Sequence, residues 1–105
     1  MDFPCVIFCT ASSEEEAKKL STALVNENLA ACVNRLQGVR SVYRWQGEVH
    51  EATEWLLIIK SHKTVLDRMI QRIRSLHSYE VPEIIALPIV GGSEDYLNWL
   101  ETNIG

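Results

Sequence analysis

A short connection between an expected helix and an expected strand carries four side chains that could do chemistry. Within LHSYEVPEII, residues 76–85, stand His77, Tyr79, Glu80 and Glu83. An imidazole can ligate a metal ion, and together with a thiolate it suits copper or zinc. A histidine at the end of a helix is also favoured there by the helix dipole. The position of His77 therefore predicts either a helix cap or a metal ligand.

The soft partner for such an imidazole would have to be a cysteine. The chain has three, Cys5, Cys9 and Cys32. Their odd number and the lack of a CxxC pair argue against a disulfide framework and for reduced thiols in a reducing compartment. Cys5 and Cys9 are four residues apart, so within a strand they share one face. Free cysteine is among the most buried residue types, so a role as a small core hydrophobe is the alternative to a ligand role.

Other motifs give no sign of a reaction. No nucleophile, base and orienting acid can be assembled at motif spacing, so we assign no catalytic residue. The pair Gly91-Gly92 lacks the spacing of a nucleotide-binding loop and is interpreted as a turn. The acidic run at 14–16 is interpreted as a first-turn patch favoured by the helix dipole. His50 and His62 are interpreted as solvated surface imidazoles.

Length and composition predict one soluble domain spanning residues 1–105. With 47% hydrophobic and 23% charged residues, the chain has an ordinary globular composition. No apolar run approaches the roughly 20 residues of a spanning helix, and the first residues lack the features of a signal peptide, so we expect a cytoplasmic protein. The net charge of -4 leaves no positive surplus, so neither nucleic acid nor a membrane is expected as a partner.

Hydrophobic periodicity predicts the elements that position these side chains. Strands are expected at residues 5–11, 30–36, 39–46, 48–60 and 83–90, and helices at 13–28, 63–76 and 93–104. A capping box at Ser13 begins the first helix, and Gly38 marks a bulge or bend between two extended segments. Gln46-Gly47 offers a tight turn. Pro88 cannot donate to a ladder, so the last strand is expected at an edge or with a bulge.

The order βαββαβ plus a terminal helix is typical of the α+β ferredoxin-like fold, the split βαβ pattern, in which both helices cover one face of an antiparallel sheet. The central hairpin is too long for a monomer. A dozen strand residues span roughly 40 Å, whereas a compact chain of 105 residues has a radius of gyration of about 13 Å. The overhanging part carries Val42, Tyr43, Trp45, Val49 and Trp55. Because such an apolar ribbon would aggregate unless paired, we expect a closed homo-oligomer.

Several motifs of this sequence resemble the CutA family of divalent-cation tolerance proteins. They are CTA at 9–11, LAACVN at 29–34, SVYRWQGEV at 41–49, HSYEVPE at 77–83 and DYLNWL at 95–100. The resemblance covers nearly the whole chain, with the motifs in family order. It implies a ferredoxin-like subunit in a tight homotrimer, in which strands of neighbouring subunits pair. It also implies a link to tolerance of divalent metals, particularly copper, and no firmly assigned reaction.

The resemblance also implies roles for particular residues. Cys9 matches the family's thiol in the first strand, and His77 matches the histidine that opens its H-P-Y motif, so these two are the expected metal ligands. Leu76 stands where some members have a second histidine, and Ser78 replaces the usual proline. Since two protein ligands are too few for a closed structural site, we expect weak, exchangeable copper binding. Cys32 matches a common family cysteine with small apolar flanks and is expected to be buried.

Two functions of different classes remain open at this point. The first is a trimeric protein that binds copper or other divalent metal ions and takes part in the response to them. The second is a regulatory or scaffolding trimer, similar to the PII signalling fold, that uses clefts between subunits for a small ligand or a partner protein. Tyr79, Glu80 and Glu83 would then fix the loop and line such a cleft. A stoichiometric metal titration separates the two.

Overall fold

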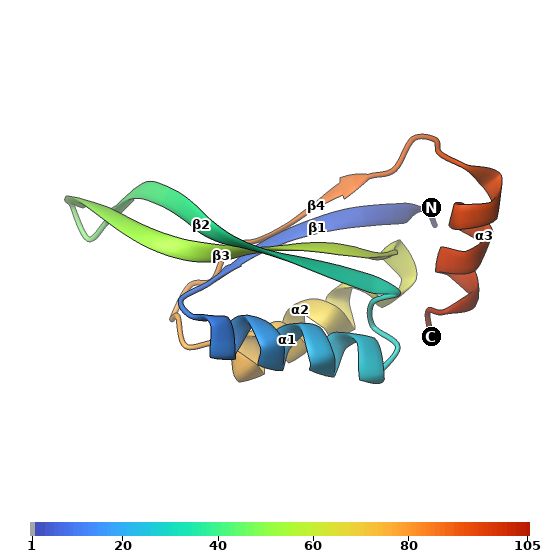
Figure 1. The fold of residues 1–105 in the computed structure, drawn as a ribbon, viewed down its shortest axis with the longest axis horizontal. Coiled ribbons are helices and arrows are strands. Elements are labelled where there is room, and N and C mark those ends of the chain that lie inside the picture. Colours follow the sequence, from blue (N-terminus) through green and yellow to red (C-terminus); the bar gives the residue numbers. More distant parts are fainter. Residues whose placement is uncertain (1) are drawn as a thin grey trace.

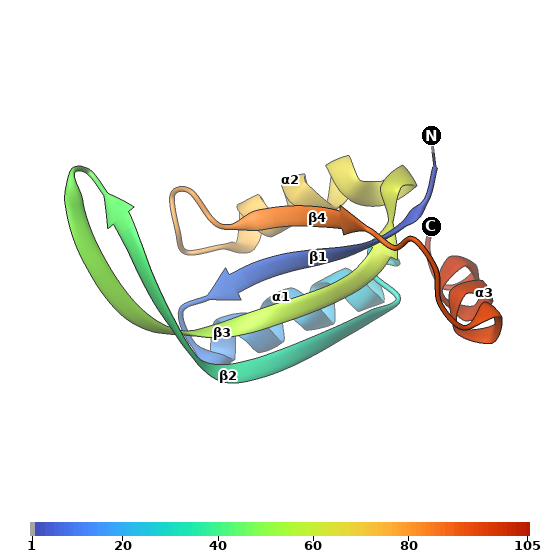
Figure 2. The same ribbon diagram turned by 90° about the horizontal axis from the view of Figure 1, so that it is seen from above.

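Strand β1, Pro4–Ala11, is the central element about which the chain folds. The computed structural model describes residues 2–105. β1 pairs antiparallel with β3, Glu48–His62, on one side and with β4, Ile84–Pro88, on the other. β2, Cys32–Trp45, pairs with β3 and completes a four-stranded sheet of order β2-β3-β1-β4. Figure 2 shows this antiparallel α+β arrangement, which confirms the predicted fold of the single chain.

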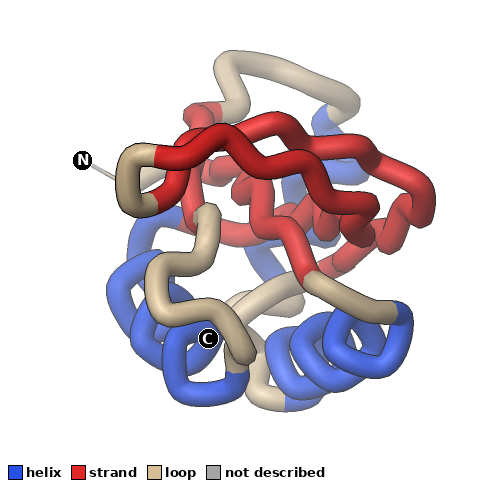
Figure 3. The backbone as a smooth tube through the Cα atoms, turned by 90° about the vertical axis from the view of Figure 1, so that its left-hand side faces the viewer, coloured by secondary structure: helices blue, strands red, loops and turns tan. Residues whose placement is uncertain are grey.

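Helices α1, Glu14–Asn26, and α2, Leu66–Leu76, lie on the same face of the sheet (Figures 1 and 3). The predicted second helix begins with a 3-10 turn, Lys63–Val65. The first helix ends earlier than predicted, because Asn28 has a φ of 60°, a left-handed conformation that no α-helix continues through. α3, Glu94–Thr102, stands at the end of the sheet opposite the hairpin tip (Figure 1). In the described part of the chain, no helix is long and apolar enough to cross a membrane.

The core lies between the sheet and the two helices that cover it. β1 contributes Cys5, Ile7 and Cys9, which alternate along the strand and are each 0% exposed. The helices and β3 contribute Leu20, Leu24, Leu57, Ile59, Met69 and Ile73, all fully buried. On β4, Ile85 and Leu87 are about half exposed, so apolar side chains remain uncovered outside this core.

The long hairpin of β2 and β3 contains the two irregularities that the sequence predicts. The register shifts between Leu36 and Val39, and Gly38 between them has a φ of 79°, which confirms the bulge. At the tip, Gln46 and Gly47 have φ values of 51° and 81°. Positive φ at both central residues is the geometry of the two-residue turn that matches the twist of the strands.

The hairpin projects beyond the body of the molecule, as Figures 1 and 2 show. The molecule measures 44 × 25 × 24 Å, which confirms the predicted overhang. Val42 and Val49 on it are 66% and 62% exposed, and Tyr43 and Trp45 are also exposed. Trp55 differs from these exposed hairpin residues, because its side chain is partly buried and packs against the core. Its predicted place on the overhang is therefore wrong, since β3 begins to pair with β1 at Trp55 itself, opposite Ala11.

Candidate functional site

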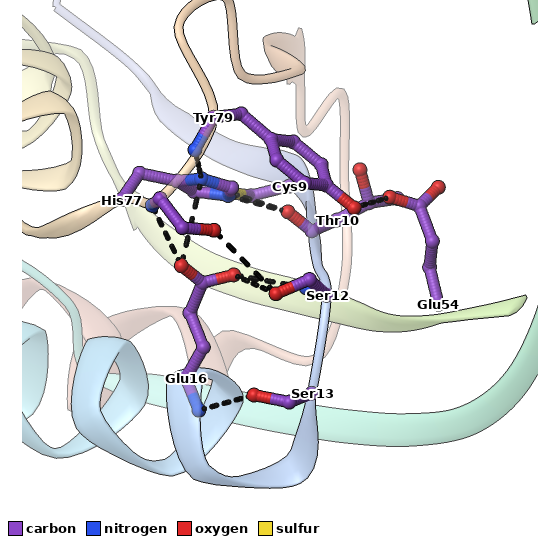
Figure 4. A network of polar contacts seen from close by, with 9 residues as sticks. Cys9, Thr10, Ser12, Ser13, Glu16, Glu54, His77 and Tyr79 are labelled. Carbon is purple, nitrogen blue, oxygen red and sulfur yellow. Dashed lines mark hydrogen bonds and ion pairs between the residues drawn. The ribbon is translucent and has the colours of Figure 1, made fainter. Parts of the chain in front are cut away.

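Two loops that are distant in the sequence meet at the end of β1. One joins β1 to α1, and the other joins α2 to β4. Side chains and backbone groups of these loops and of the adjoining ends of β1 and α1, together with a carboxylate of β3, form a hydrogen-bonded group that we call the loop cluster. It consists of Thr10, Ser12, Glu16, Glu54, His77, Ser78 and Tyr79. Figure 4 labels all of these except Ser78.

The Glu16 carboxylate joins the two loops. Its Oε1 accepts from the Ser12 amide at 2.9 Å and from the Ser12 hydroxyl at 3.0 Å, and its Oε2 accepts from the Ser78 amide at 2.7 Å. Burial raises the pKa of Glu16, but the donors at Ser12 and Ser78 and the nearby His77 outweigh burial and lower it to about 2. Glu14, Glu15 and Glu16 do lie in the first turn of α1 as predicted, but Glu16 is buried and joins the two loops.

The start of α1 explains how Glu16 comes to point at both loops. Ser13 is the N-cap, and its hydroxyl accepts from the Glu16 amide at 3.1 Å, which confirms the predicted cap. In a complete capping box the glutamate would accept from the amide of the cap residue itself. Here it accepts from the preceding residue, Ser12, and its second oxygen stays available for Ser78.

The His77 ring is held on both sides by the backbone. Its Nε2 lies 2.7 Å from the carbonyl oxygen of Thr10, and its Nδ1 accepts from the Tyr79 amide at 3.0 Å. A carbonyl can only accept, so this pattern places a proton on Nε2. The side chain is 0% exposed, and Nδ1 is also 3.8 Å from Glu16 Oε2. The amide of His77 donates to Ile73 and ends α2, so the residue is a helix C-cap as well.

Tyr79 ties the same loop to β3. Its hydroxyl donates to Oε2 of Glu54 at 2.5 Å, and its ring lies 4.8 Å from the ring of His77. Burial, followed by the bond to Glu54 and the charge of Glu54, raises the pKa of Tyr79 above its ordinary value. Glu54 is only 5% exposed. Sequence reasoning missed Glu54, and the only signal was a carboxylate directly before the apolar run at 55–59.

The Cys9 thiol lies inside β1 beside this cluster. The side chain is 0% exposed. Burial, and then the negative charges of Glu83, Glu16 and Glu54, raise the pKa of Cys9 to about 12. At neutral pH such a thiol is protonated. Because the thiolate is the form that ligates metals and attacks disulfides, Cys9 is unreactive as it lies.

Comparison with known proteins decides the family. The family model of the CutA1 divalent ion tolerance protein matches residues 5–103. The chain belongs to the CutA1 family. The divalent-cation tolerance protein CutA of Thermus thermophilus is 49% identical to it over 100 residues, which cover 95% of this chain and 97% of that protein. The chloroplastic CutA of Arabidopsis thaliana is 46% identical over 98 residues, which cover 93% of this chain and 54% of that protein.

Solved CutA structures have the same fold as this CutA1-family chain. The structure of the Thermus thermophilus protein superimposes with a TM-score of 0.96 at 48% identity, over 98% of this chain and 100% of that one. The structure described as the periplasmic divalent cation tolerance protein CutA of Archaeoglobus fulgidus superimposes with a TM-score of 0.94 at 32% identity. The match covers 98% of this chain and 100% of that one. The resemblance predicted from the motifs is therefore confirmed.

The residues predicted as metal ligands in this CutA1-family chain do not fit a metal site as they lie. Both ring nitrogens of His77 are used in hydrogen bonds, and the thiol of Cys9 is buried and protonated. Within residues 2–105, no group of three or more His, Cys, Asp or Glu side chains could hold a metal ion. The fold does bring the two residues to one place, since His77 bonds to Thr10, the neighbour of Cys9. Their role as ligands stays a prediction.

Other residues that the sequence singled out lie outside the loop cluster. His62 is not a solvated imidazole as predicted, because its side chain is only 13% exposed, caps the 3-10 turn and faces Glu101 at 3.8 Å. Cys32 is half-buried and not fully buried as expected. Glu80 and Glu83 point to solvent in the single chain, so their predicted part in a cleft between subunits depends on assembly.

Proposed function

We propose that this chain acts as a homotrimer in tolerance of divalent cations, in the reducing cytoplasm. The observation that carries the assembly is the projecting hairpin, which ends in apolar side chains that the single chain leaves exposed, Val42 and Val49 among them. Pairing with further copies would cover these side chains and the free strand edges, which otherwise favour aggregation. Membership of the divalent ion tolerance family supports the biological role. Three free thiols support a reducing compartment.

Sedimentation analysis tests the assembly. A single species with three times the mass of the chain, unchanged on dilution to low micromolar concentration, is the expected result. The matched variants are Val42→Lys and Val49→Lys, which place a charge on the apolar hairpin and should shift the population toward smaller species. A folded monomer of the wild type at micromolar concentration would remove the proposal.

We further propose that copper binds weakly and exchangeably, with Cys9 and His77 as the donors. Imidazole and thiolate are soft or borderline donors, and copper stands highest among the common divalent ions in affinity for them. Copper binding should be weak because both donor side chains are already engaged within the protein. The thiol would have to lose a proton against a pKa of about 12, and the ring would have to give up its bond to Thr10 or to Tyr79. Metal-free protein should therefore keep its fold.

Calorimetric titration of copper tests this assignment. Wild type, Cys9→Ser and His77→Ala are compared at neutral pH. Cys32→Ser and His50→Ala are the controls, because they remove a half-buried thiol and an exposed imidazole outside the loop cluster. Loss of binding in the first pair alone supports the assignment. Equal binding in all five proteins would place the site elsewhere.

A second function, a regulatory or scaffolding trimer, is favoured by one specific observation. The imidazole of His77 and the carboxylates of Glu16 and Glu54 are all consumed by internal bonds that hold the loops in place. A framework fixed in this way can present its neighbouring surface, with the exposed Glu80 and Glu83, to a small ligand or a partner protein. A trimer that takes up no copper in the titration would make this function the better one.

A further inference from the structure

A hollow of about 380 Å³ opens between the C-terminal end of α1 and the outer side of α2. It is lined by Glu27, Leu29, Arg68, Gln71, Arg72 and Ser75. The four lining residues of α2 are spaced by three, four and seven positions, so they lie on one face of the helix. Helical periodicity thus directs two guanidinium groups, an amide and a hydroxyl toward one place.

The hollow is locally positive although the chain is negative overall. The net charge is -4, yet Arg68 and Arg72 face a single carboxylate there, that of Glu27. Nε of Arg72 lies 3.0 and 3.1 Å from the two carboxylate oxygens of Glu27, and its Nη2 lies 2.9 Å from Oε2. Nη1 of Arg72 is 3.4 Å from the Ser75 hydroxyl. Within residues 2–105, Arg68 forms no ion pair.

We propose that this hollow binds the phosphate group of a small molecule, held by Arg68 and Arg72. Guanidinium forks match the geometry of phosphate oxygens and bind them in pairs. The Glu27 carboxylate already occupies the Arg72 fork, so the fork is preset for an anion, and Glu27 competes with the ligand. Both members of that pair are about 40% exposed, and exposed ion pairs contribute little. A doubly charged phosphate that contacts two arginines therefore displaces Glu27.

The hollow stays accessible in the proposed trimer. The exposed large apolar side chains lie on the hairpin, the β4 region, α3 and α1, and none of them is on α2. Figure 3, seen from the hairpin end, shows α1 and α2 together on one face of the sheet. Assembly through the apolar surfaces therefore leaves the outer side of α2 open to solvent.

The test is titration of the full-length protein with inorganic phosphate and with adenosine monophosphate, followed by NMR chemical shifts and calorimetry. Arg68→Ala should weaken binding roughly fivefold or more, and Arg72→Lys, which keeps the charge and removes the fork, by a similar factor. Glu27→Gln removes the competitor and should tighten binding roughly fivefold. Arg74→Ala is the control, since Arg74 is an exposed arginine of the same helix that does not line the hollow.

Tighter binding of the nucleotide would assign the site to a phosphate ester, and equal binding would assign it to free phosphate; both support the proposal. An equal loss in Arg74→Ala would show a diffuse charge effect and overturn it. So would weaker binding in Glu27→Gln than in wild type, or a wild type that shows no shift at tens of millimolar phosphate. Circular dichroism of each variant separates loss of the site from loss of the fold.

Discussion

Replacing Glu16 with glutamine should destabilise the protein by about 3 kcal/mol at neutral pH. The shift of the Glu16 pKa from 4.5 to about 2 corresponds to about 3 kcal/mol of preference for the charged form in the folded state. Counting the hydrogen bonds of the carboxylate gives a loss of stability of the same order of magnitude. Glutamine keeps one acceptor oxygen but turns its NH₂ toward a donor, the amide of Ser12 or Ser78, and a buried donor without an acceptor costs roughly 1 to 3 kcal/mol.

The pH dependence separates the charge of Glu16 from its shape. The folded pKa lies below the unfolded one, so the stabilisation by Glu16 is fully present above pH 4.5. It is lost progressively as the pH falls toward about 2, where the folded protein also takes up the proton. The difference in unfolding free energy between wild type and Glu16→Gln should therefore be constant near neutrality and shrink across that window.

Urea denaturation at a series of pH values from neutral to about 2.5 measures this difference. Protein concentration must be held constant, because the stability of an oligomer depends on it. Glu15→Gln is the matched control. Glu15 occupies the same first turn of α1 and the same end of the helix dipole, but it is exposed. Its replacement should cost less than about 0.5 kcal/mol.

Two outcomes would refute the reasoning. A Glu16→Gln variant as stable as Glu15→Gln at neutral pH would show that the three hydrogen bonds to the carboxylate contribute nothing beyond the helix dipole. A large difference that stays the same at pH 2.5 would show that the side chain acts by shape or packing and not by its charge.

Further expectations concern the tyrosine bond, the turn, the thiols and thermal stability. Tyr79→Phe should cost about 1 to 3 kcal/mol, because it leaves the buried Glu54 carboxylate without its donor at 2.5 Å. Glu54→Leu removes the acceptor, and no further loss in the double variant would confirm the coupling, whereas additive losses would contradict it. Gly47→Ala should cost about 1 kcal/mol, since the residue has a φ of 81° at the hairpin tip, and an unchanged urea midpoint would refute this. Cys32 should react with a soluble disulfide reagent faster than Cys9, which is fully buried and has a pKa of about 12; equal rates in the native protein would contradict the burial of Cys9. The proposed trimer should unfold above the usual mesophile range of about 45 to 65 °C, because burial between subunits would add to a small core; calorimetry that finds a midpoint within that range would refute this.

Local signals in the sequence were enough to predict most of the fold. Residues within a few positions of one another carry the signals for four features, which are the apolar stripe of α2, the serine cap at Ser13, the glycine at position 38 and the turn at Gln46-Gly47. The overhang of the hairpin also followed from strand length alone. The predicted end of the first helix was two residues too late, because a single left-handed residue, Asn28, ends it early.

The loop cluster, in contrast, was decided by tertiary structure. The sequence by itself determined that His77 ends a helix and that Cys9 lies in a buried strand. It could not determine that Glu16 bonds to Ser78, 62 positions away, or that His77 bonds to Thr10, 67 positions away. Such contacts exist only once the sheet order places the ends of β1 and α2 together. The same pairing decides whether a carboxylate is a solvated surface charge or a buried clamp, because the burial and the donors come from another part of the chain.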